Sequence, residues 1–223
     1  MWQSLTERLA DQPFTVIAVA LDEPEAARPW IEAARPSYPC LIDREHRVAE
    51  LYHLTNVPQA VWIDEEGRIA RAAGNAGSTD AFRSMDRTTG AMPADALAER
   101  QRVKAAYAAA VEDWARRGAR SPHVGAAGDR VRPDRGVADA HAQFRLAQAL
   151  RREGRGAEAG AAFAEASRLH PESWAIWRQG AAKNETGLAV GDAFWARVDA
   201  LGGKPYHRPI VLAETPAAEP PAA

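Results

Sequence analysis

The sequence predicts an α/β domain followed by a helical region. Short apolar, β-branched runs, such as FTVIAVALD from Phe14 and AVWID from Ala60, alternate with segments of helical character in the first half. In the second half apolar residues recur at helical spacing, beginning with a long helix that Pro93 opens. A chain of 223 residues is long enough for one ordinary domain and a helical extension.

The composition excludes several classes of protein. Apolar residues make up 46% and charged residues 26%, as in ordinary globular proteins, and the net charge of −2 gives no reason to expect nucleic acid as a partner. No apolar run reaches the length of a membrane span, and no secretory pattern is visible, so we expect a cytoplasmic location. One cysteine excludes a disulfide within the chain.

The elements of the first domain follow from local patterns. Continuous apolarity predicts that the strand Phe14–Leu21 is buried on both faces. Pro29 is expected to open a short helix, and Asp43 to cap the next one. The side chains expected to face inward on these two helices are Trp30, Ile31 and Ala34 on the first and Val48, Leu51 and Tyr52 on the second.

A hairpin is expected after the second of these helices. The strand Ala60–Asp64 follows an X-Pro pair, and the acidic turn at Gly67 leads into a second strand. The position of Val57-Pro58 directly before the strand predicts a cis peptide bond. Ser78 or Thr79 is then expected to cap a helix that continues to about Thr89.

Residues 1–90 resemble a known family in the order of these pieces. The runs YPCLID, NVP, AVWID and EGRI resemble the C-terminal two-thirds of a thioredoxin-like domain, of the redoxin branch of thiol–disulfide oxidoreductases and antioxidant peroxiredoxins. The resemblance implies that Val57 and Pro58 form the substrate-side loop. It implies no cofactor and no metal.

The chain departs from the family where the family does its chemistry. There, a Cys-x-x-Cys or a single peroxidatic cysteine lies at the start of the first long helix, and no cysteine precedes Phe14 here. We therefore assign no catalytic residue and expect the family activity to be absent. The family's central strand, between Phe14–Leu21 and Ala60–Asp64, is also missing. The flanking strands could pair directly, a partner strand could fill the gap, or the chain could be a fragment, which is the outcome we expect.

The second half is divided into three parts. Residues 91–118 are expected to form a long connecting helix and residues 119–137 a linker. Residues 138–202 resemble a tetratricopeptide repeat region, on the spacing of Leu146, Ala147, Leu150, Gly154, Ala159, Phe163, Ala166 and Pro171. We expect this region to need a cover, which the long helix could supply through Tyr107, Val111 and Trp114. Residues 203–223 are expected to be a disordered tail.

Two further sets of residues were considered as sites. Cys40 lies in a short apolar strand and is expected to be structural, not reactive. His46, Glu50 and His53 share one helical face at metal-ligand spacing, but no fourth ligand is evident, so a solvated polar face is expected.

Two functions remain open. The chain is either a redoxin-family protein without its cysteine motif or a non-catalytic module that binds a protein or peptide through residues 138–202. The sequence does not indicate an oligomeric state.

Overall fold

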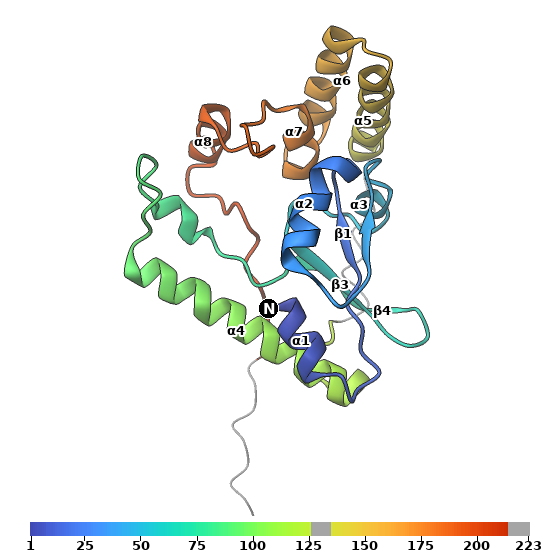
Figure 1. Cartoon of the computed structure of the whole chain (residues 1–223), viewed down its shortest axis with the longest axis vertical. Helices are drawn as coiled ribbons and strands as arrows, with labels where there is room; N and C mark the ends of the chain where they lie inside the picture. The colour runs from blue at the N-terminus through green and yellow to red at the C-terminus, as the bar shows by residue number, and fades with distance from the viewer. Residues whose placement is uncertain (126–134, 214–223) are drawn as a thin grey trace, which may run out of the picture.

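The computed structural model describes residues 1–125 and 135–213. Figure 1 shows the strands in the middle of the molecule, with α5 and α6 at one end and α1 and α4 at the other. In chain order the described elements are α1 (Trp2–Arg8), β1 (Ala18–Ala20), α2 (Pro24–Ala34), β2 (Cys40–Ile42), α3 (Arg47–Leu51), β3 (Gln59–Ile63), β4 (Ile69–Asn75), the 3₁₀ helix η1 (Asp80–Ser84), α4 (Ala94–Arg117), the 3₁₀ helix η2 (Gly118–Arg120), α5 (Arg135–Arg152), α6 (Gly156–Leu169), α7 (Trp174–Gly180) and α8 (Asp192–Asp199).

The described strands form two separate sheets of two strands each. β1 and β2 pair in parallel, with Ala18 opposite Cys40, and β3 and β4 form the predicted antiparallel hairpin. Gly67 takes a positive φ of 76° in the hairpin turn. β1 and β3 do not pair with each other. The prediction that the first strand is buried on both faces is wrong, because Ile17 is 58% exposed. A strand with one neighbour lacks the cover that a larger sheet would supply.

α4 was expected to cover the helical region, but it packs against a different part of the chain. Tyr107 and Val111 are buried, as their spacing predicted, but they pack with Leu5, Leu9 and Trp62, among others, from α1 and β3. The indole N–H of Trp62 donates to the hydroxyl of Tyr107 at 3.0 Å. α1 and β3 present the apolar faces that complete the α4 stripe, so α4 covers the first domain and not the helical region.

The first two helices after β1 also differ in which faces they bury. α2 begins at Pro24 and not at Pro29, because proline lacks an N–H and the first turn of a helix leaves its N–H groups unpaired. The helix continues through Pro29, and Trp30 is exposed. In α3, Leu51 is 69% exposed, whereas His46 and Ala49 are each 1% exposed. The expected inward stripe of α3 is therefore wrong, because a helix of the second half packs on the opposite face.

The N-cap at Thr79 was predicted correctly, whereas the N-cap position of α3 is His46 and Asp43 supports that helix from three residues earlier. The Asp43 carboxylate accepts hydrogen bonds from the amides of Arg47 and Val48, both at 2.8 Å. The Thr79 hydroxyl accepts from the amide of Ala81. The helix after Thr79 is shorter than expected, however, and is the 3₁₀ helix η1. It ends early because the Asp86 carboxylate accepts the amides of Thr88 and Thr89, both at 2.8 Å, and holds them in a turn.

The helical region contains an antiparallel pair of helices, α5 and α6, joined by a turn at Gly154 with a φ of 76°. Their shared core consists of Ala140, Phe144, Ala147, Leu150, Ala159, Ala162, Phe163, Ala166 and Ile176. α7 approaches closely, since a Cβ placed on Gly180 would lie 2.7 Å from the Cβ of Phe163. Leu146 is 48% exposed on the outer face of α5.

The expected linker and tail are partly ordered. The Gly125 amide donates to the Ala70 carbonyl at 3.0 Å and Arg71 donates to the His123 carbonyl, so residues 123–125 lie against β4. Residues 203–213, expected to be disordered, run back from α8 toward α4 (Figure 1), with Tyr206 buried in an aromatic cluster. Apolar side chains at Tyr206, Ile210 and Leu212 account for this packing. The rest of the expected linker up to Asp134, and residues 214–223, lie outside the described residues.

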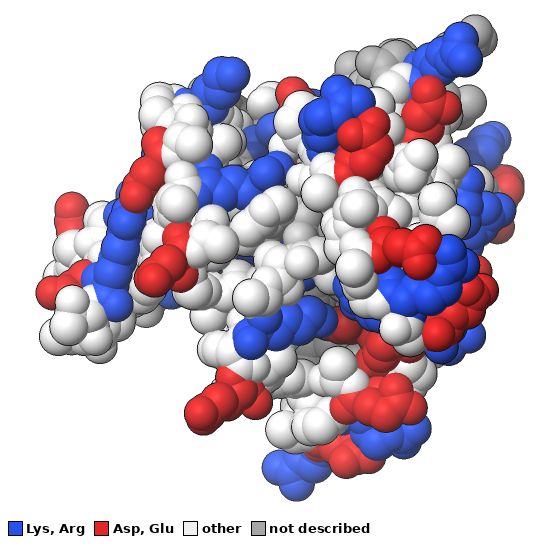
Figure 2. Space-filling model, turned by 90° about the horizontal axis from the view of Figure 1, so that it is seen from above, with Lys and Arg blue, Asp and Glu red and all other residues white. Residues whose placement is uncertain are grey.

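The described surface carries charges of both signs. Figure 2 shows Lys and Arg next to Asp and Glu, with uncharged areas between them, so this face has no patch of one sign. Within residues 1–125 and 135–213, every helix is too short or too polar to cross a lipid bilayer.

Candidate functional site

The loop before β3 is the predicted substrate-side loop. The Val57-Pro58 bond is cis, as predicted. The Gln59 side-chain oxygen accepts from the Thr55 amide at 2.8 Å and from the Asn56 amide at 3.2 Å. The Asn56 oxygen accepts from the Val57 amide at 2.9 Å. The loop therefore holds its shape through its own polar side chains.

Few polar groups of this loop are left for a ligand. The Val57 N–H is engaged by Asn56, and the Pro58 carbonyl accepts from the Ala76 amide at 3.2 Å. Among the hydrogen bonds of the described residues, none uses the Val57 carbonyl. Val57 itself is 42% exposed. A ligand at this loop would meet the Val57 side chain and one carbonyl acceptor.

The inner side of the loop is covered by the second half of the chain, which the sequence did not predict. The Ala175 amide of α7 donates to the Thr55 carbonyl at 3.0 Å. Asn56 is buried, and its amide nitrogen donates to the Tyr206 carbonyl at 3.3 Å. The guanidinium of Arg178 donates to the Tyr206 hydroxyl. In the sequence, the apolar run around Ile210 was the one indication that the C-terminal segment would pack against the rest of the chain.

Tyr206 belongs to an aromatic cluster that joins α7, α8 and η1. Its ring lies 4.5 Å from that of Trp174 and 4.9 Å from that of Phe82, both edge to face. Burial raises the pKa of the Tyr206 hydroxyl above its usual range. The Asp80 carboxylate of η1 accepts the amides of Tyr206 and His207, at 2.7 and 2.8 Å. The cluster therefore anchors the C-terminal segment next to the cis-proline loop.

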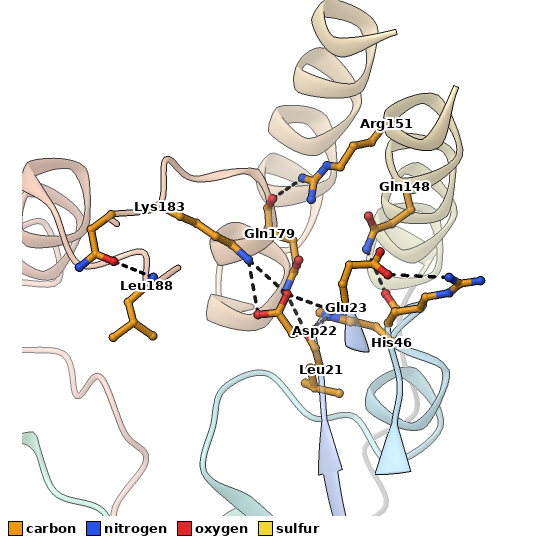
Figure 3. Close-up of polar contacts among 11 residues, drawn as sticks. Leu21, Asp22, Glu23, His46, Gln148, Arg151, Gln179, Lys183 and Leu188 are labelled. Atoms are coloured by element: carbon orange, nitrogen blue, oxygen red, sulfur yellow. Dashed lines mark hydrogen bonds and ion pairs between the residues drawn. The ribbon is translucent and has the colours of Figure 1, made fainter. Parts of the chain in front are cut away.

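A second set of contacts joins the carboxyl end of β1 to the helical region, and we refer to it as the junction (Figure 3). The Leu21 carbonyl accepts from Nε2 of His46 at 3.2 Å and from Nε2 of Gln179 at 2.8 Å. Lys183 pairs with Asp22 at 3.2 Å. One carbonyl thus connects β1, the start of α3 and α7.

α3 and α5 form the other side of the junction. The His46 ring lies 4.3 Å from the Phe144 ring, at an interplanar angle of 31°. Arg145 pairs with Glu50 at 2.6 Å. Figure 3 shows Gln148 reaching from α5 toward this end of the first domain, where its amide nitrogen donates to the Arg44 carbonyl at 3.0 Å.

The junction corrects our expectation for His46, Glu50 and His53. These residues were expected to form a solvated face, but His46 is buried against α5 and Glu50 is paired with Arg145. His53 is exposed and takes a positive φ of 56°. The three side chains do not converge, and no group of three His, Cys, Asp or Glu residues in the described part of the chain could hold a metal ion.

Cys40 lies in β2 and is partly buried. Its thiol donates to the Tyr38 carbonyl at an Sγ–O distance of 3.7 Å. It does not lie at a helix N-terminus, where a thiolate would be stabilised. This position agrees with the expected structural role.

Comparison with known proteins bears on the first domain. The model of the AhpC/TSA family matches residues 2–72. No curated protein and no solved structure matches the chain. The matched segment runs from α1 into β4 and includes the cis-proline loop, but it stops before α4 and the helical region. The match therefore supports a thioredoxin-like redoxin assignment for the part of the chain from α1 to β4.

Proposed function

We propose that this chain is a redoxin-type protein that carries out no thiol–disulfide or peroxidase turnover by itself. The observation that carries the proposal is the environment of its one cysteine. Cys40 lies inside a β-strand and donates to a backbone carbonyl, with no helix N-terminus beside it. Reduction of a disulfide by a chain cycling between dithiol and disulfide needs a second thiol, and peroxide reduction needs a stabilised, accessible thiolate. The chain has no second thiol, and Cys40 has no helix N-terminus beside it.

A turnover assay tests this proposal. The full chain and its Cys40→Ser variant are compared for reduction of a protein disulfide and for consumption of peroxide, each with dithiothreitol as the terminal reductant. Both proteins should match the buffer blank, with a two-cysteine oxidoreductase as the positive control. Turnover by the parent chain that disappears in the variant would overturn the proposal.

A binding function is the second candidate. In this proposal the cis-proline loop takes an extended peptide through the Val57 carbonyl, and residues 138–202, read as a tetratricopeptide-like unit, take a protein partner. The exposure of Val57 and of Leu146 supports the two halves of this candidate. α3 covers part of α5, so a partner would have to use the face that carries Leu146. If Leu146→Asp abolishes binding of a partner and Val57→Asp does not, the partner binds to the helices and not to the cis-proline loop.

A cytoplasmic location is also a proposal. A chain with one cysteine cannot form an internal disulfide, so an oxidising compartment would not stabilise it in this way. Fractionation of cells that produce the tagged chain would test it, and recovery outside the cytoplasm would exclude it.

A further inference from the structure

Two buried histidines lie on the elements that meet at the junction. His46 stands at the start of α3, and His141 lies on α5. His141 is one turn before Phe144 and Arg145, the two α5 residues that contact α3. We propose that protonation of His46 and His141 releases α5 to α7 from the first domain, so that mild acid opens the junction. This proposal does not depend on the proposed lack of turnover.

His46 is held in its neutral form by its surroundings. Its Nε2 must donate, because its partner, the Leu21 carbonyl, can only accept. The second proton would therefore go to Nδ1, which is buried and has no hydrogen-bond partner among the described residues. The ring is 1% exposed and stacks on Phe144. Burial lowers the pKa of His46, because the cation would have neither water nor an acceptor at Nδ1.

His141 is in a similar position on the opposite side. It is buried, and its ring centre lies 6.4 Å from that of His170 at the end of α6. Burial lowers the pKa of His141 from 6.5 to about 4. Glu50 acts in the opposite direction, whereas His170, His46 and Arg145 lower this pKa further.

The carboxylates that face the pair are already engaged. Asp43 and Asp22 face His46 and favour its cation, and Glu50 faces His141. The Asp43 oxygens accept backbone amides at the start of α3, Asp22 pairs with Lys183, and Glu50 pairs with Arg145. A positive charge on either ring would therefore arise at a place where the nearby carboxylates already have other partners.

The direction of the pH effect follows from these shifts. Both histidines bind a proton less readily in the docked state, so docking is fully favoured above pH 6.5 and weakens as the pH falls toward about 4. At about pH 5, with its ring fully exposed in the open state, His141 would raise the ratio of open to docked molecules on the order of 10- to 30-fold. His46 acts in the same direction.

Opening would uncover the inner side of the cis-proline loop. The one backbone hydrogen bond from α7 to this loop, among the described residues, joins the Ala175 amide to the Thr55 carbonyl at 3.0 Å. Protection of the Ala175 amide from hydrogen exchange therefore reports docking directly. Phe163, inside α6, reports whether the helical region itself stays folded.

The test uses hydrogen exchange of the full chain, followed by NMR at about pH 7.5 and about pH 5. The protection factor of Ala175 should fall at least ~10-fold at the lower pH, while that of Phe163 stays unchanged. The double variant His46→Gln/His141→Gln should show no fall, because a glutamine amide in place of the His46 ring can still donate to Leu21 and neither new side chain titrates. His53→Gln, which removes an exposed histidine next to α3, is the matched control and should behave like the parent.

Three results would overturn the proposal: equal Ala175 protection at both pH values, an equal fall in the double variant, or a parallel loss of protection at Phe163. If the double variant does not fold, the ring protons of His46 and His141 are titrated in the parent chain. Midpoints below the ordinary value of about 6.5 support the proposal, and a midpoint at or above it for either ring overturns it.

Discussion

Phe144 is the residue through which the helical region and the first domain share a core. It is fully buried, lies 5.8 Å from the Phe163 ring inside the helix pair, and stacks on His46 across the junction. Transfer of a buried Phe side chain to water costs about 1.5–3 kcal/mol. The cavity left behind raises the loss for Phe144→Ala to about 3–5 kcal/mol, a large share of the stability of an ordinary domain.

Urea unfolding followed by circular dichroism and tryptophan fluorescence measures this loss. Leu146→Ala, two residues away on the exposed side of α5, is the control and should change the free energy of unfolding by less than about 0.5 kcal/mol. Phe144→Ala should also raise the pKa of His46 toward its usual value, because the ring loses its cover. A loss below about 1 kcal/mol, or one equal to that of Leu146→Ala, would refute the shared core.

Four other substitutions can be measured by the same unfolding experiment. Gly180→Ala should destabilise by about 1–3 kcal/mol, because its Cβ would meet that of Phe163 at 2.7 Å. Gly160→Ala, in open space on α6, should instead stabilise by about 0.4–1 kcal/mol, and equal effects at the two glycines would contradict the close approach of α7. Tyr206→Phe should cost about 1–3 kcal/mol, since Arg178 loses its hydroxyl acceptor in a partly buried position, and no change would mean that this contact is not formed in solution. Asp43→Ala should cost about 1–2 kcal/mol through the lost cap of α3, whereas an unchanged midpoint would show that α3 does not depend on it.

The sequence predicted those features that depend on residues close together in the chain. The cis Val57-Pro58 bond, the turn at Gly67, the cap at Thr79 and the turn at Gly154 were all correctly placed. Each depends on backbone geometry or hydrogen bonds within a few residues, and the residue types concerned have few alternatives.

The inward face of α3 could not be predicted because a distant helix determines it. The spacing of Val48 and Leu51 suggested an apolar stripe, but Phe144 and Arg145, nearly one hundred residues later, pack on the opposite face. A five-residue helix carries too little periodicity to show that its polar side is the buried one. The cover on the inner side of the cis-proline loop was missed for the same reason, because it comes from Ala175, Arg178 and Tyr206.

The apolar strand β1 shows a different limit. Its apolar composition predicts burial, but composition indicates only which side chains could be buried if neighbouring strands were present. Only β2 pairs with it among the described strands, so Ile17 remains exposed. The number of neighbours is a property of the whole sheet and is not encoded in the strand.

Arg71 connects the first domain to the far end of the described chain. Its guanidinium donates to the His123 carbonyl at 2.8 Å and to the Val211 carbonyl at 2.6 Å, so this β4 side chain joins three segments far apart in sequence. During synthesis on the ribosome, β4 emerges long before Val211 does, and until then the guanidinium lacks one of these acceptors. Contacts at such separation make folding slow, because a long loop must close before they form. This contact of the first domain can therefore form only after nearly all the described chain has been made.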